Sequence, residues 1–134
     1  MKYCFDTDII VEFFRGNDNI VGKVSKVLNS RDDEIYLSTI TLCELYRGAY
    51  LAKNTQKELE KINILLQSFK ILHFSLAVCK LFGKISASLV QAGKMVGEAD
   101  LLIGVSALER NYVVVTNNTK HFTRIPNLKI ENWL

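Results

Sequence analysis

Short apolar runs alternate along the chain with longer stretches in which apolar residues recur every three or four positions. The short runs are typical of β-strands and the longer stretches of amphipathic helices. The predicted strands cover residues 2–5, 35–37, 69–74 and 112–115, the last a β-branched run typical of a central strand covered on both faces. Residues 128–133 are predicted to be a short edge strand with its tail. The predicted helices cover residues 9–14, 20–28, 41–52, 59–66, 76–90 and 98–110. Because strands separated by helices are joined by parallel crossovers, the sequence predicts an α/β fold, a three-layer sandwich with a central parallel sheet flanked by helices.

Length and composition indicate one folded domain over residues 1–134. Hydrophobic residues make up 49% of the chain and charged residues 23%, which excludes disorder. Three widely spaced cysteines (Cys4, Cys43 and Cys79) are expected to be buried, reduced thiols rather than disulfides or zinc ligands. No apolar run approaches the length of a membrane span and no signal-peptide core is visible, so we expect a cytoplasmic protein with no membrane partner.

Polar residues follow the predicted strands where open parallel sheets form their sites. Asp6 follows the first strand, and Glu44 lies in about the first turn of the helix after the second. Asp100 opens the helix before the last central strand, and Asn118 follows that strand. Three carboxylates and an amide on one sheet edge repel one another unless a cation lies among them, and oxygen ligands favour Mg²⁺ or Mn²⁺. Such a site suits phosphoryl hydrolysis by a metal-activated water.

Each of these residues also has a local interpretation. Asp6 or Asp8 is suited to cap the helix that follows, and the spacing of Thr41 and Glu44 fits a capping box. Glu98 and Asp100 fit the first turn of a helix, where they would interact with its dipole, and Asn118 fits an ordinary turn. Independent helix caps have no reason to fall on the same sheet edge at three separate crossovers. The joint placement therefore favours the acidic cluster.

Five motifs in order along the chain resemble those of a known family. They are Phe5-Asp6-Thr7-Asp8, Ser38-x-x-Thr41-Leu42-x-Glu44-Leu45-x-x-Gly48, Glu98-Ala99-Asp100-Leu101-Leu102-Ile103, Val115-Thr116-Asn117-Asn118-x-x-x-Phe122 and Ile130-Glu131-Asn132-Trp133. None is specific alone, but together they span nearly the whole chain. On these motifs the sequence resembles PIN-domain ribonucleases, and specifically the VapC-type toxins of toxin–antitoxin pairs.

The resemblance implies a Mg²⁺-dependent endoribonuclease in which Asp6, Glu44 and Asp100 are the catalytic, metal-binding acids. Such enzymes cleave a phosphodiester by water attack, leaving a 5′-phosphate and a 3′-hydroxyl, and Mn²⁺ is a plausible substitute for Mg²⁺. VapC-like toxins typically cut a structured RNA, often a tRNA. They are inhibited by a VapB-like antitoxin whose C-terminal tail enters the active-site groove, and they usually form homodimers within toxin–antitoxin hetero-oligomers.

The sequence departs from the family pattern at Asn118, where many PIN domains carry a fourth acid. An amide adds no charge, so we expect one firmly bound ion, with Asp8 or Glu98 as partial compensation. Thr116 is a further supporting candidate, either orienting a carboxylate or simply ending a strand. Lys53, Lys57 and Lys61 recur every four residues, which suits either an RNA-binding stripe or a solvated helix face.

Three alternatives remain open at this point. The first is a housekeeping PIN nuclease that processes RNA without an antitoxin. The second is an inert PIN domain kept as a binding module, although three retained acids disfavour it. The third is a receiver-like signalling domain, which needs an acid at the end of a middle strand, whereas the predicted strand around Ile71 ends in His73-Phe74-Ser75.

Overall fold

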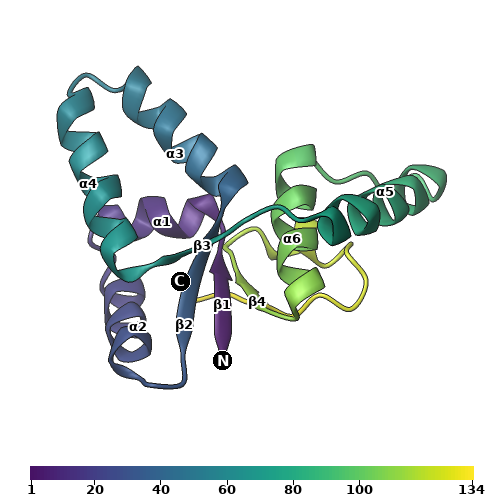
Figure 1. Cartoon of the computed structure of the whole chain (residues 1–134), viewed down its shortest axis with the longest axis horizontal. Coiled ribbons are helices and arrows are strands. Elements are labelled where there is room, and N and C mark those ends of the chain that lie inside the picture. The colour runs from purple at the N-terminus through teal and green to yellow at the C-terminus, as the bar shows by residue number, and fades with distance from the viewer.

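The computed structural model describes all 134 residues and confirms the predicted fold, a parallel sheet covered by helices on both faces (Figure 1). The sheet has five strands in the order β3-β2-β1-β4-β5, and every neighbouring pair is parallel. A receiver-like sheet has a different strand order, which excludes that alternative. The strands are β1 (Lys2–Phe5), β2 (Glu34–Ser38), β3 (Lys70–Leu72), β4 (Val113–Val115) and β5 (Ile130–Glu131).

Seven helices connect the strands. They are α1 (Thr7–Phe14), α2 (Asp18–Asn29), α3 (Thr39–Leu51), α4 (Thr55–Ser68), α5 (Leu76–Gln91), α6 (Glu98–Arg110) and α7 (Thr119–Phe122). Polar side chains fix several starts, since those of Asn17, Ser38, Asn54 and Ser75 accept hydrogen bonds from the first-turn amides of α2, α3, α4 and α5. The one-turn helix α7 was not predicted, because four residues are too few to show a helical period.

The edge strand β3 is shorter than the pattern predicts, whereas β5 is short, as expected. Helix α4 continues to Ser68, and the side chain of Ser75 caps α5, which leaves only Lys70–Leu72 to pair with β2. At the other edge only Ile130 and Glu131 pair with β4. Apolar residues outside these limits still contribute to the core without forming strand pairs.

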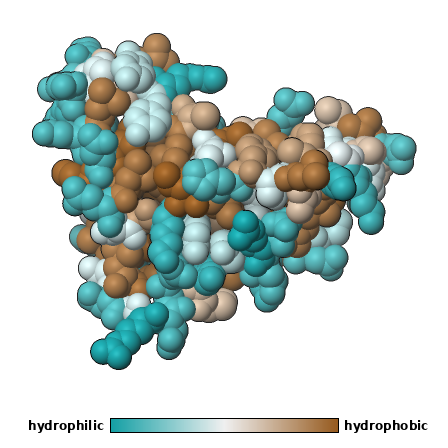
Figure 2. Space-filling model, viewed as in Figure 1, coloured by the Kyte–Doolittle hydropathy of each residue, from teal (hydrophilic) through white to brown (hydrophobic).

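Alternating side chains of the inner strands fill two separate hydrophobic cores, one on each face of the sheet. Phe5 and Val115 point to the core under α1, α2, α3 and α4, whereas Cys4 and Val114 point to the core under α5 and α6. This alternation is the period of a β-strand covered on both faces. Two lobes of helices result, and Figure 2 shows the molecule hollowed between them.

The cysteine prediction was wrong for two of three residues. Cys4 is buried, but Cys43 on α3 and Cys79 on α5 are exposed, and all three thiols are free. Both exposed positions lie on helix faces that turn away from the cores, which the helical period alone did not reveal. No helix combines the length and hydropathy that crossing a membrane would require.

Candidate active site

The carboxyl ends of β1, β2 and β4 meet at one edge of the sheet and bring the candidate residues together. Asp6 directly follows β1, and its backbone N–H donates to the carbonyl of Val115 at 2.9 Å, which ties the ends of β1 and β4. Helix α3 starts directly after β2 and carries Glu44, while Asp100 lies in the first turn of α6. The parallel topology therefore produces the predicted convergence on one edge.

Asp6 is both a helix cap and a member of the cluster. One carboxylate oxygen accepts from the Thr7 amide at 2.8 Å, so the local interpretation as a cap is confirmed. The other oxygen accepts from the Thr116 hydroxyl at 2.9 Å, and that hydroxyl in turn accepts from the backbone N–H of Asn118 at 2.8 Å. Asp6 is only 5% exposed, so its charge is held nearly out of water by these contacts.

Asp8 lies beside Asp6 with one carboxylate oxygen unsatisfied. Its Oδ2 accepts from the Asn117 amide at 3.0 Å, but its buried Oδ1 has no partner. Burial, followed by the charge of Asp8, raises the pKa of Asp6 to about 7, while the hydrogen bonds from Thr116 and Thr7 lower it. Burial is also the main cause that raises the pKa of Asp8. Two carboxylates thus share a poorly solvated position with no cation to balance them.

Asp100 faces this pair from α6 and is held by two side chains of the segment after β4. Its Oδ2 accepts from the side-chain Nδ2 of Asn118 at 3.2 Å and lies 3.2 Å from His121 Nδ1. Asn118 Nδ2 and His121 Nδ1 are themselves 2.8 Å apart. Asn118 is therefore more than a turn residue, since its side chain holds an acid from a different element.

Glu44 is held by Thr7, a residue that sequence reasoning did not single out. The Thr7 hydroxyl donates to Glu44 Oε1 at 2.6 Å and lies 3.4 Å from the buried Thr41 hydroxyl. Ser38, not Thr41, caps α3, so Glu44 lies in the second turn and the capping-box interpretation was wrong. The only sequence signal for Thr7 was its place between two aspartates. Its contact with Glu44 could not be predicted, because the two residues are 37 positions apart.

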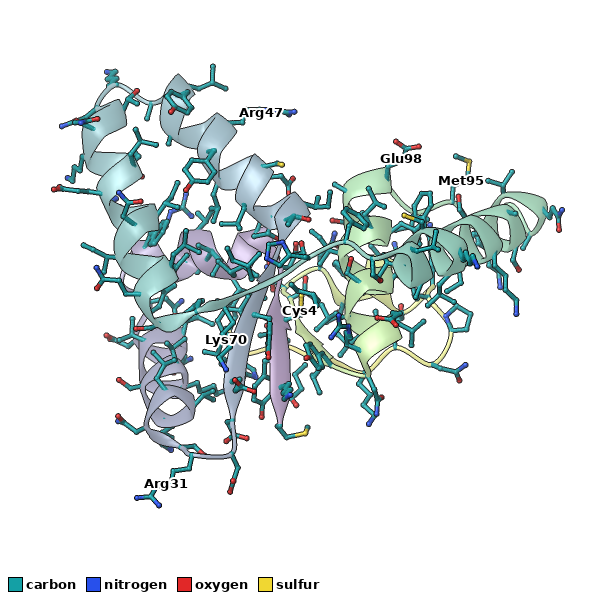
Figure 3. The ribbon with its side chains drawn as sticks, in the orientation of Figure 1. Cys4, Arg31, Arg47, Lys70, Met95 and Glu98 are labelled. Atoms are coloured by element: carbon teal, nitrogen blue, oxygen red, sulfur yellow. The ribbon has the colours of Figure 1, made fainter.

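Glu98 does not join the cluster. It is exposed, forms no hydrogen bond or ion pair, and Figure 3 shows its carboxylate projecting outward from the first turn of α6. No three of the His, Cys, Asp and Glu side chains close into a ready-made set of metal ligands. Yet an oxygen-only donor set, an unpartnered buried Oδ1 and a raised Asp6 pKa suit a hard divalent cation, which commonly keeps part of its shell as water.

A groove of about 330 Å³ runs from Glu44 along α1, α3 and α4. We call it the α1–α4 groove; its apolar wall includes Val11, Phe14, Leu45 and Ile62, and its charged residues are Arg15, Glu44, Glu58 and Lys61. Both cations are ion-paired, Arg15 with Glu12 at 2.8 Å and Lys61 with Glu58 at 3.1 Å. In the predicted stripe of Lys53, Lys57 and Lys61, the third lysine is therefore already paired with an acid.

Comparisons with known proteins identify the family of this chain. The PIN domain family model matches residues 3–128. Ribonuclease VapC2 of Rickettsia felis is 35% identical over 133 residues, which cover 99% of this chain and 98% of that protein. The tRNA(fMet)-specific endonuclease VapC of Shigella flexneri is 29% identical over the same shares. The structure of VapBC2 from Rickettsia felis bound to a promoter DNA fragment aligns over the whole of both chains with 33% identity and a TM-score of 0.93. The chain therefore belongs to the PIN domain family, among its VapC-type ribonucleases.

Proposed function

We propose that this chain is a metal-dependent endoribonuclease that acts as the toxin of a toxin–antitoxin pair. The observation that carries the metal dependence is the pairing of buried Asp6 with half-buried Asp8. No basic side chain forms an ion pair with either carboxylate, and the buried Oδ1 of Asp8 has no partner. Asp100 adds a third carboxylate at the same edge. A site that concentrates negative charge in this way favours the binding of Mg²⁺ or Mn²⁺.

Asp6, Glu44 and Asp100 are the proposed ligands, each supported by a neighbouring side chain. Thr116 orients Asp6, Thr7 orients Glu44, and Asn118 orients Asp100. When bound, a divalent ion would supply an activated water and balance the charge of the scissile phosphate. Asp8 adds charge beside Asp6, which partly offsets the absence of an acid at position 118, whereas the outward Glu98 does not.

The proposed substrate is a structured RNA, with a tRNA as the first candidate. A relative that matches 99% of this chain is named a tRNA(fMet)-specific endonuclease, which supports the same substrate class here. Attack by water on the phosphodiester leaves a 5′-phosphate and a 3′-hydroxyl. The chain's own residues hold the acids in place, while the fold of the RNA contributes to which bond is cut.

The proposed protein partner is a VapB-like antitoxin. Solved relatives are VapBC complexes, which supports an antitoxin rather than the housekeeping alternative. The α1–α4 groove begins at Glu44, so a tail seated there would block the acid cluster. We also propose a homodimer, supported by exposed apolar side chains such as Leu76 (70% exposed) and Val90 (57% exposed) on α5.

The test compares wild type with Asp100→Asn, using Glu109→Gln at the far end of α6 as a matched control. Purified proteins of equal thermal stability are incubated with total tRNA in Mg²⁺ or EDTA, and RNA ends are mapped. We expect Mg²⁺-dependent cleavage by wild type and the control, and at least a ~100-fold loss for Asp100→Asn. Equal cleavage by all three proteins, or cleavage unaffected by EDTA, would refute the assignment.

The toxin role is tested separately in cells. Expression of wild type should arrest growth, and co-expression of the product of a small adjacent reading frame should relieve the arrest. Asp100→Asn should not arrest growth. If wild type cleaves RNA in vitro but no neighbouring gene product inhibits it, the housekeeping nuclease becomes the better description.

A further inference from the structure

Uncompensated basic residues flank the acid cluster on the side of α6 and α7. Positions 111–125 contain no Asp or Glu, whereas Lys120 and Arg124 contribute two positive charges. Helix α5 and the loop that follows it, positions 76–97, also lack acids and contain Lys80, Lys84 and Lys94. A surface with an excess of one charge attracts a polyion of the opposite sign. This half of the molecule is therefore the more favourable one for a polyanion.

Two contacts hold part of this basic sequence next to the site. His121 Nδ1 lies 3.2 Å from Asp100 Oδ2, which places α7 beside the cluster. Arg124 Nη1 donates to the Met95 carbonyl at 2.7 Å, which joins the end of α7 to the loop between α5 and α6. Met95 is 67% exposed, and Figure 3 shows it at the turn that leads into α6. Lys94 precedes it, so two distant segments present their cations together.

These cations are free to bind a ligand. Lys94, Lys120 and Arg124 are exposed, and none of them forms an ion pair with an acid. Arg124 uses one donor for the Met95 carbonyl and keeps further N–H groups, because a guanidinium carries five. On the opposite side of the cluster, both cations of the α1–α4 groove are already paired with glutamates. The groove lining therefore offers no unpaired cation, whereas three unpaired cations lie on or beside α7.

We propose that the RNA backbone approaches the acid cluster over α7 and the α5–α6 loop, where Lys94, Lys120 and Arg124 bind its phosphates. This inference rests on the proposed function, since it assigns a path to the substrate of that reaction. The acid cluster alone repels RNA, so an adjacent basic surface is needed to hold the backbone against it. Phosphate contacts position a nucleic acid without reading its sequence, so this surface sets register rather than specificity.

The test measures binding of fluorescently labelled bulk tRNA by anisotropy, in EDTA so that the RNA is not cut. The variants are Lys94→Gln and Lys120→Gln, because these side chains make no contact on which folding depends. The controls remove the same charge elsewhere. Lys129→Gln lies just before β5, at the opposite end of the strands, and Lys57→Gln lies on α4.

We expect Lys94→Gln and Lys120→Gln each to weaken binding about fivefold at about 100 mM salt, and to reduce the slope of log Kd against log salt by about 0.7. Both controls should stay within about twofold of wild type. If Lys57→Gln weakens binding as much as Lys120→Gln does, the RNA passes over α4 or binds without a fixed path, and the inference is wrong.

Cleavage in Mg²⁺ separates this failure from failure of the proposed function. If wild type cleaves tRNA while Lys94→Gln and Lys120→Gln bind it as tightly as wild type does, only the proposed path is refuted. If wild type does not cleave RNA, the proposed nuclease is refuted. If wild type also fails to bind tRNA, both proposals are refuted.

Discussion

Replacing Asp6 with Asn removes a negative charge that the fold holds almost out of contact with water. We expect this change to stabilise the metal-free protein at neutral pH, although it removes a residue of the proposed active site. Burial and then the charge of Asp8 raise the pKa of Asp6 from 3.8 to about 7. An acid with a raised pKa in the folded state destabilises the fold increasingly as the pH rises from the unfolded pKa to the folded pKa, because the unfolded chain ionises at lower cost.

The structure sets the sign and the scale of the effect. Between pH 4 and pH 7 the folded state keeps a proton that the unfolded chain has lost, so stability falls as pH rises, by at most about 1.4 kcal/mol per pH unit. The ceiling is about 4 kcal/mol at pH 7.5. Asn retains the helix cap through its single carbonyl oxygen but presents a donor NH2 group to the Thr116 hydroxyl, and this lost acceptor costs about 1–2 kcal/mol. The expected net gain is about 1–3 kcal/mol.

Urea denaturation in EDTA at pH 5.0 and pH 7.5 measures this directly. Wild type should lose stability between the two pH values, and Asp6→Asn should lose much less. Glu60→Gln, which removes an exposed acid without an ion pair, is the matched control and should follow wild type. Mg²⁺ should then stabilise wild type more than Asp6→Asn. An Asp6→Asn variant that is no more stable than wild type at pH 7.5, with an unchanged pH slope, would refute the reasoning.

Three further predictions concern positions around the site and the core. Thr7→Val should lower RNA cleavage about 10- to 100-fold by releasing Glu44, with no comparable loss of stability, and Thr7→Ser should keep most of the wild-type activity. Equal losses of activity in both variants would show that the Thr7 hydroxyl does not position Glu44. Asn118→Asp should add a second firm Mn²⁺ site by supplying a fourth carboxylate, which calorimetric titration would detect as a change in stoichiometry. Gly104→Ala should lower the free energy of unfolding by about 1 kcal/mol despite the better helix propensity of Ala, because the new Cβ would lie 2.4 Å from Ile125 Cδ1; a gain in stability would show that Ile125 moves freely.

Much of the fold could be predicted because the spacing of apolar residues in a strongly periodic segment shows which of its faces is buried. The run Tyr112–Val115 predicted an inner strand, and β4 is buried on both faces of the sheet. The length of the edge strand β3 was overestimated, since pairing there depends on where the neighbouring helices end and begin and not on apolar character. Helix α7 escaped prediction although Phe122 at its end is fully buried, because one turn leaves no period to detect.

The candidate site was predicted in outline for a topological reason. Parallel strands carry their carboxyl ends to one edge, so Asp6, Asp100 and Asn118 had to lie near one another once the sheet was parallel. The hydrogen bonds between them did not follow from the sequence. Thr7 contacts Glu44, and His121 contacts Asp100, because the tertiary fold brings side chains of different elements within hydrogen-bond distance.

The sequence by itself determined the order of the elements, the two-sided burial of the inner strands and the chemical identity of the acids. These properties depend on residues close together along the chain, or on the alternation that a strand imposes. Only the tertiary structure decided that Glu98 points outward, that Asp8 keeps an unpartnered oxygen and that the cations on and beside α7 form no ion pair. Those outcomes depend on distances between remote segments, which no local pattern encodes.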